Sequence, residues 1–149
     1  MRVMDVMAQQ PYVVTASDPV ARVARTMRDF NLALVPVVDD RRGMRVRGVI
    51  TERDLVVRHV AAGCPPGHRA QDVMTRYAWA TLRPDDGIED ALARMLGADV
   101  QQALVTDGEE RLLGIVSARD LLRARSDREQ AGVEKLLREV METPMLVES

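Results

Sequence analysis

The chain contains one structural unit twice. Residues 46–55 read VRGVITERDL and residues 112–121 read LLGIVSARDL, so the same segment recurs 66 positions later. The flanks repeat as well, since Asp-Val-Met occurs at residues 5–7 and again at 72–74. Self-similarity of this kind means that one supersecondary unit was copied. Two copies are too few for a solenoid, so the sequence predicts two modules packed about a pseudo-two-fold axis.

Composition and charge exclude several kinds of partner. The 149 residues are of single-domain size, and a formal net charge of −2 provides no basic field for nucleic acid or an anionic membrane. The N-terminus lacks the apolar core of a signal peptide, and the longest apolar run, Leu32–Val38, is too short to cross a bilayer. The single cysteine, Cys64, cannot form an intramolecular disulfide and favours a reducing compartment. We therefore expect a cytoplasmic protein without nucleic-acid or membrane partners.

Each copy predicts the same order of elements, strand–helix–strand–strand–helix, and hence an α/β fold. The first helices begin at residues 17–19 and 84–86, where helix start signals precede apolar residues at helical spacing. The strands are expected, in chain order, at residues 13–15, 33–38, 46–50, 79–81, 102–106 and 112–116. The repeated segment then begins the last helix of each copy. The two small sheets are expected to pack against each other.

The expected boundaries follow from this pattern. Residues 1–62 form the first module, 63–69 a linker rich in glycine and proline, and 70–124 the second module. Residues 125–149 form a C-terminal helix and tail, with the helix from about 127 to 141. An apolar stripe on that helix predicts that it packs on the module or on a second subunit.

The repeated turn into a helix supports two interpretations. In the first, Thr51 caps the helix and Asp54 closes a variant capping box, so that these residues only begin the helix. In the second, the helix N-terminus and Arg53 bind a phosphate, while the carboxylate accepts hydrogen bonds from ribose hydroxyls. Both copies contain Asp rather than the usual Glu or Gln, and both place Arg before it. These shared departures favour a sugar-phosphate ligand.

The paired units resemble tandem cystathionine-β-synthase (CBS) domains, a Bateman module of the small stand-alone bacterial type. The resemblance rests on Asp-Val-Met, on the strand Val35–Asp39 and on the repeated Gly-h-h-[Thr/Ser]-x-x-Asp segment, in which h is apolar, and it covers roughly residues 1–124. It implies clefts between the two motifs that bind an adenosyl ligand such as AMP, ADP, ATP or S-adenosylmethionine. It implies no cofactor, and family behaviour together with leftover apolar helix faces suggests a homodimer with an unidentified protein partner.

The resemblance also implies the roles of individual residues. Asp54 and Asp120 would bind ribose hydroxyls, and the first strand and the strand around Pro36 would line the base pocket. Trp79 would either fill the second base pocket or stack on a base, and Gln102–Val105 replaces the proline-containing strand there. The expected ligand-binding residues are Thr15, Val35, Pro36, Thr51, Arg53, Asp54, Thr81, Ser117, Arg119 and Asp120.

The predicted function is therefore non-catalytic binding of an adenosyl ligand, read out through dimer geometry or partner binding. No convincing nucleophile–base pair or glycine-rich phosphate loop is present. One alternative is a structural or interaction module without a ligand. Another is a metal- or redox-responsive stress protein that uses His59, Cys64 and His68, although their spacing matches no standard zinc pattern.

Overall fold

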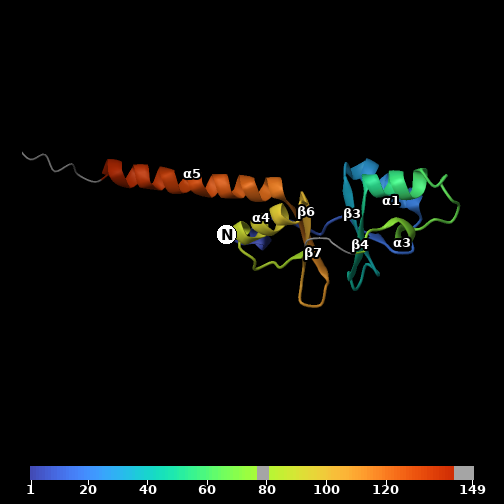
Figure 1. The fold of residues 1–149 in the computed structure, drawn as a ribbon. Helices are drawn as coiled ribbons and strands as arrows, with labels where there is room; N and C mark the ends of the chain where they lie inside the picture. The colour runs from blue at the N-terminus through green and yellow to red at the C-terminus, as the bar shows by residue number, and fades with distance from the viewer. Residues whose placement is uncertain (77–80, 143–149) are drawn as a thin grey trace, which may run out of the picture.

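The computed structural model describes residues 1–76 and 81–142, which form two units side by side (Figure 1). The first unit has a sheet in the order β2-β3-β4, with its helices on one face. Its elements are β2 (Val14–Thr15), α1 (Val20–Phe30), β3 (Leu34–Val38), β4 (Val46–Thr51), α2 (Glu52–Leu55) and the helical turn η2 (Val56–Val60). The predicted strand–helix–strand–strand–helix order is confirmed.

The second unit repeats this order and adds one strand at the edge of its sheet. Its sheet has the order β1-β7-β6-β5, in which β5 is parallel to β6, and β7 is antiparallel to both β6 and β1. Its elements are β1 (Ala8–Gln9), β5 (Thr81–Leu82), α4 (Ile88–Gly97), β6 (Gln102–Thr106), β7 (Leu112–Ser117) and α5 (Ala118–Glu142). The expected strand at residues 79–81 falls largely outside the described residues, as does Trp79.

Alternation along the strands produces three core layers. Val35 and Val37 of β3 point toward α1, whereas Leu34 and Val38 point toward the other sheet. A central cluster therefore joins the sheets, with Leu34, Val38 and Val49 on one side and Leu104 and Leu112 on the other. The predicted packing through the sheets is confirmed, and burial of this apolar surface holds the units together.

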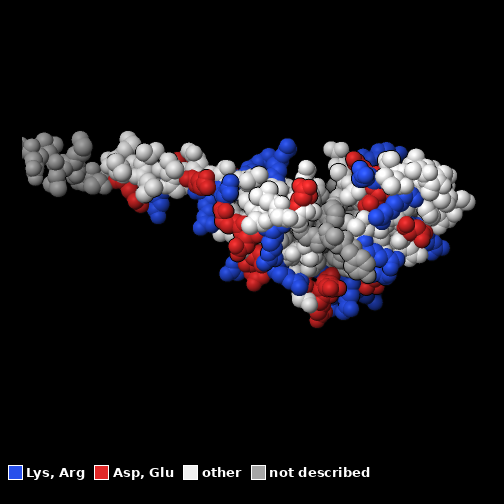
Figure 2. All heavy atoms as spheres, in the orientation of Figure 1, with Lys and Arg blue, Asp and Glu red and all other residues white. Residues whose placement is uncertain are grey.

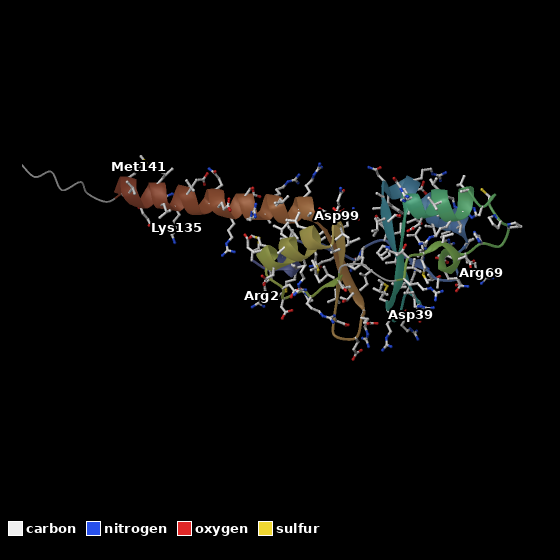
Figure 3. All side chains as sticks on the ribbon, viewed as in Figure 1. Arg2, Asp39, Arg69, Asp99, Lys135 and Met141 are labelled. Carbon is white, nitrogen blue, oxygen red and sulfur yellow. The ribbon has the colours of Figure 1, made fainter. Side chains whose placement is uncertain are left out.

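The hairpin turns mark the pseudo-two-fold relation. The Val46 amide donates to the Glu110 carbonyl (3.1 Å), and the Leu112 amide donates to the Met44 carbonyl (2.8 Å). Because residues 46 and 112 occupy the same place in their copies, the two bonds are equivalent. Figure 3 labels Asp39 near this end of the first hairpin.

The Asp-Val-Met elements are exchanged between the units. The first lies in η1 (Val3–Asp5) and its continuation, and it packs in the core of the second unit, where Val3 is fully buried. The second, in α3 (Ala70–Val73), packs in the core of the first unit. Each segment then pairs with the last strand of the unit that it joins, Ala8 with Ile115 and Thr75 with Val49. Each unit is therefore completed by a segment that precedes the other in sequence.

The C-terminal region differs from the expectation in one respect. The second motif helix and the predicted C-terminal helix form one continuous helix, α5, of 25 residues. No glycine or proline lies between residues 118 and 131, so nothing in the sequence interrupts the backbone hydrogen bonds. The outer part of α5 extends away from the body, and residues 126–142 are exposed (Figures 1 and 3). This half of the helix does not pack on its own module. Neither α5 nor any other helix among the described residues is long and apolar enough to cross a membrane.

The start of α1 also differs in detail. The start signal at residues 17–19 predicts Pro19 as the first helical residue, but Pro19 is the N-cap, and no side chain caps this helix. Asp18 instead accepts a hydrogen bond from the Thr15 amide (2.9 Å) and lies within ion-pair distance of Arg22 and Arg41. Its carboxylate therefore fixes the turn that leads from β2 into the helix.

Candidate functional site

A cavity of about 420 Å³ opens where the two units meet. One wall is the first half of β4 with the segment after α3, and the other is the β5–β6 edge. Among the described residues, its polar lining consists of Arg47, Thr75, Arg76, Thr81, Arg83, Thr106 and Glu110. Ligand pockets commonly have volumes of roughly 300 to 1,000 Å³. We call this hollow the inter-unit cavity.

The three arginines of the inter-unit cavity are held differently. Nη1 of Arg83 donates to Thr106 Oγ1 (3.0 Å) and to the carbonyl oxygens of Thr106 and Asp107. Arg47 and Arg76 are exposed, and neither has an ion pair or a hydrogen bond to a side chain within residues 1–76 and 81–142. The cavity therefore presents one anchored guanidinium and two that have no anionic partner in the described chain.

Asp54 closes a capping box and also bonds to a residue of the cavity wall. Its carboxylate accepts from the Thr51 amide (2.9 Å), and the Asp54 amide donates to Thr51 Oγ1 (3.1 Å). Oγ1 of Thr75, which lines the inter-unit cavity, donates to the same carboxylate at 3.2 Å. Nε of Arg58 lies 3.9 Å from Oδ1 of Asp54, and the Asp54 side chain is 13% exposed. Asp54 is thus bonded within its own chain, with a cavity beside its Thr75 partner.

The second motif is more open. The Asp120 amide donates to Ser117 Oγ (3.0 Å), as expected for a helix start. The Asp120 side chain is exposed, and it borders a hollow of about 290 Å³ together with Asp5, Arg123 and Asp127. Ala8 occupies the place that Thr75 has beside Asp54, so this aspartate has no corresponding hydroxyl.

The predicted phosphate-binding residues lie together, but away from the inter-unit cavity. Thr51 and Arg53 line a hollow of about 280 Å³, and Ser117 and Arg119 line one of about 560 Å³. Gln101 and Gln102 border both hollows. The structure therefore places the starts of the two motif helices on one shared surface, beside the first residue of β6.

The predicted base-pocket residues are placed unequally. Thr81 lines the inter-unit cavity, and Leu104, the second-copy counterpart of Pro36, lines it too. Pro36 is buried in β3, opposite Val49. Val35 is fully buried in the core beneath α1, on the opposite face of its strand.

Thr15 and Thr81 do not occupy equivalent positions, although the sequence pairs them. Val14 lies opposite Val37 in the first sheet, and Leu82 lies opposite Val105 in the second. Residues 37 and 105 are counterparts, so Thr15 corresponds to Arg83, and Thr81 corresponds to Val13. The two copies are offset by 68 residues up to β3 and β6 but by 66 in the repeated motif, because the turn after β3 is two residues longer than the turn after β6.

The polar residues of the inter-unit cavity that sequence reasoning missed are Arg47, Thr75, Arg76, Arg83, Thr106 and Glu110. None of them is repeated in the other copy, and the repeat was the signal that selected candidates. Thr75 and Arg76 follow directly after the second Asp-Val-Met segment, which packs on the first unit. The sequence does not show this exchange, so it could not place these two residues at the cavity.

His59 and His68 lie close together at the two ends of the linker turn. Nδ1 of His59 lies 3.1 Å from Nδ1 of His68, and Cys64 in the turn between them is exposed. In the described part of the chain, no three or more His, Cys, Asp or Glu side chains gather in a way that could hold a metal ion.

Comparison with known proteins identifies the family. The family model described as CBS domain matches residues 3–59 and 70–127. The chain belongs to the CBS-domain family. Each match falls on one of the two repeats, and the tandem arrangement of CBS domains inferred from the sequence is confirmed.

Several proteins of this family are similar over most of the chain. Hypoxic response protein 1 of Mycobacterium tuberculosis is 27% identical over 80% of this chain and 81% of that protein. A crystal structure of Hypoxic Response Protein I with two coordinated zinc ions has a TM-score of 0.71 and 26% identity, and the match covers 83% of this chain and 98% of that one.

Two further structures contain adenosyl compounds. CBSX2 in complex with AMP has a TM-score of 0.75 and 23% identity, with 86% of this chain and 98% of that chain covered. The CBS pair of MJ0100, in complex with 5′-methylthioadenosine and S-adenosylmethionine, has a TM-score of 0.71 and 22% identity, with the same coverage. At these identities the likeness establishes the shared fold.

Proposed function

We propose that this protein is a non-catalytic regulatory module that binds an adenosyl compound reversibly in the inter-unit cavity. The observation that carries the proposal is the cavity itself, which combines hydroxyl and guanidinium groups from both units. Hydroxyls and arginines suit a sugar and a phosphate, and the volume suits a nucleoside. The AMP complex of CBSX2 and the adenosyl complexes of MJ0100 support this ligand class for the same fold.

Asp54 is assigned to the ribose in this proposal. Its carboxylate already accepts a hydroxyl hydrogen bond from Thr75 at the cavity wall. A ribose hydroxyl can take the place of the Thr75 hydroxyl without leaving the carboxylate unpaired. Binding would then be coupled to the start of α2 and to the crossing segment after α3, because Asp54 bonds to both.

The test is a thermal-unfolding panel with AMP, ADP, ATP, adenosine and S-adenosylmethionine. A ligand at 100 times its Kd should stabilise the native protein by about 2.7 kcal/mol and raise Tm. Asp54→Asn keeps an oxygen for the Thr51 amide, so it should abolish the shift while the unliganded Tm changes little. Asp85→Asn, at an exposed aspartate outside the cavity, is the matched control. If no compound raises Tm, the chain is a ligand-free scaffold and the proposal fails.

The regulatory output is proposed to be a change in subunit arrangement in a homodimer. A ligand shifts such an equilibrium only by its difference in affinity for the two arrangements. The inter-unit cavity lies between two units joined by an apolar layer, so a ligand that contacts both walls can bias their relative position.

A further inference from the structure

We infer that the two clefts related by the pseudo-two-fold axis are not equivalent. Only the inter-unit cavity binds the ligand, and that ligand carries a polyphosphate. This inference rests on the proposed function and specifies it: one nucleoside di- or triphosphate per chain, held by Arg47 and Arg76. The repeated motif alone predicts two matching clefts. The side chains that line them differ in charge.

The strand pairing identifies the counterparts of the two free arginines. Gly48 and Gly114 are equivalent in the repeat, so Arg47 corresponds to Leu113. Thr75 pairs with Val49 as Ala8 pairs with Ile115, so Arg76, the next residue, corresponds to Gln9. The second cleft therefore has a leucine and a glutamine where the inter-unit cavity has two guanidinium groups.

The other polar residues of the inter-unit cavity also have uncharged counterparts in the second cleft. Arg83 corresponds to Thr15, as the sheet registers show. The three threonines of the cavity, at 75, 81 and 106, correspond to Ala8, Val13 and Val38. Val13 packs against the apolar cluster between the sheets, and Val38 is fully buried in it. Met44, the counterpart of Glu110, packs there too.

Charge decides which ligands fit. In the part of the lining that the structure describes there are three arginines and one glutamate, whereas the corresponding positions of the second cleft carry no charge. A guanidinium matches the geometry of phosphate oxygens with paired donors, and such charge-assisted hydrogen bonds are strong. Arg41, which lines a hollow on the other side together with Val13 and Met44, is within ion-pair distance of Asp18. The geometry selects against uncharged adenosine and against the sulfonium cation of S-adenosylmethionine.

The first test is isothermal titration calorimetry of the full chain with adenosine, AMP, ADP, ATP and S-adenosylmethionine. Affinity should rise with each added phosphate, weaken as salt screens the arginines, and saturate at one ATP per chain. Two equal ATP sites per chain would overturn the inference, as would equal affinities for adenosine and ATP. In either case adenosyl binding itself would stand, so the proposed function would survive.

The second test replaces each arginine by its counterpart from the other copy. Arg47→Leu and Arg76→Gln should each weaken ATP binding by roughly tenfold and leave adenosine binding unchanged. Arg128→Leu, which removes the same charge from the exposed surface of α5, should leave ATP affinity unchanged. If Arg53→Gln weakens ATP binding while Arg47→Leu does not, the phosphates lie at the motif surface and the inference is wrong.

Inorganic tripolyphosphate separates this inference from the proposed function. It should raise the Tm of the wild-type protein and not that of the Arg47→Leu/Arg76→Gln double variant. A shift with tripolyphosphate but with no adenosyl compound would support the anion site and refute the proposed function. Equal shifts in the wild type and the double variant would refute the anion site.

Discussion

Two glycines explain why the repeated segment begins as it does. A Cβ on Gly48 would lie 2.6 Å from the carbonyl oxygen of Thr75, and one on Gly114 would lie 2.7 Å from that of Ala8. In both places the exchanged segment crosses the last strand of a unit. The glycine is thus required by close backbone approach, and it keeps the wall of the inter-unit cavity in place at Thr75.

Substitution of either glycine should weaken the contact between the last strand of its unit and the exchanged segment. Gly48→Ala and Gly114→Ala should each destabilise the protein by about 1 to 3 kcal/mol, because the backbone must move to make room for the methyl group. Gly132→Ala, in the exposed interior of α5 with no atom within 4 Å of the added Cβ, should instead stabilise by up to about 1 kcal/mol. Urea unfolding of the three variants measures the difference. Equal effects at all three positions would contradict the crowding argument.

At the scale of elements, each of the two hairpin turns is closed by an aspartate at the equivalent position of its copy. Oδ1 of Asp39 accepts from the amides of Asp40 (2.7 Å) and Arg45 (3.0 Å), and Oδ1 of Asp107 accepts from those of Glu109 (2.8 Å) and Arg111 (3.0 Å). These backbone donors lower the pKa of both carboxyls below the ordinary value. Figure 2 shows both signs of charge at the lower edge of the body, where these turns lie.

A lowered carboxyl pKa makes the turns sensitive to acid. Their contribution to stability is present above the ordinary aspartate pKa of about 4 and is lost as pH falls below it. Asp39→Asn/Asp107→Asn keeps a carbonyl acceptor and removes the titration, so the acid loss of stability should be smaller in this variant. Urea midpoints from about pH 3 to 7 measure it, with Asp85→Asn as the control. An unchanged pH profile would show that the turns do not contribute.

For the whole molecule, the outer half of α5 is not covered by any other part of the described chain. Its outer half has an apolar stripe of Val133, Leu136, Leu137, Val140 and Met141, whose residues are 50% to 85% exposed. Helices obtain most of their stability from packing of such a face. Much of the surface on this half of α5 is uncharged in Figure 2, and the labelled Lys135 and Met141 lie beyond the body in Figure 3. We propose that a second copy of the chain covers the stripe.

This proposal predicts a dimer that depends on α5. Leu136→Glu should convert the dimer to a monomer, because a carboxylate cannot be buried unpaired in an apolar interface. Ala131→Glu, on the opposite face, adds the same charge and should leave the dimer intact. Light scattering after size exclusion distinguishes the two. A monomeric wild type would refute the proposal, and a dimer that survives Leu136→Glu would place the interface elsewhere.

Local and repeated features were readable from the sequence. Strand alternation, helix start signals and the second copy of each element correctly predicted the strand–helix–strand–strand–helix order and the packing of the two sheets. They did so because these features depend on residues close together in the chain or on a pattern that occurs twice. The predicted capping box at Thr51 and Asp54 is confirmed for the same reason.

Only the tertiary structure showed which segments meet. The exchange of the Asp-Val-Met segments places Thr75 and Arg76 opposite Thr81 and Arg83, and no local pattern encodes that contact. The two-residue difference in offset likewise makes Arg83, and not Thr81, the counterpart of Thr15 within the fold. A repeat reports what the copies share, whereas the cavity is lined by what they do not share. Its charge therefore emerged only when both units were placed in space.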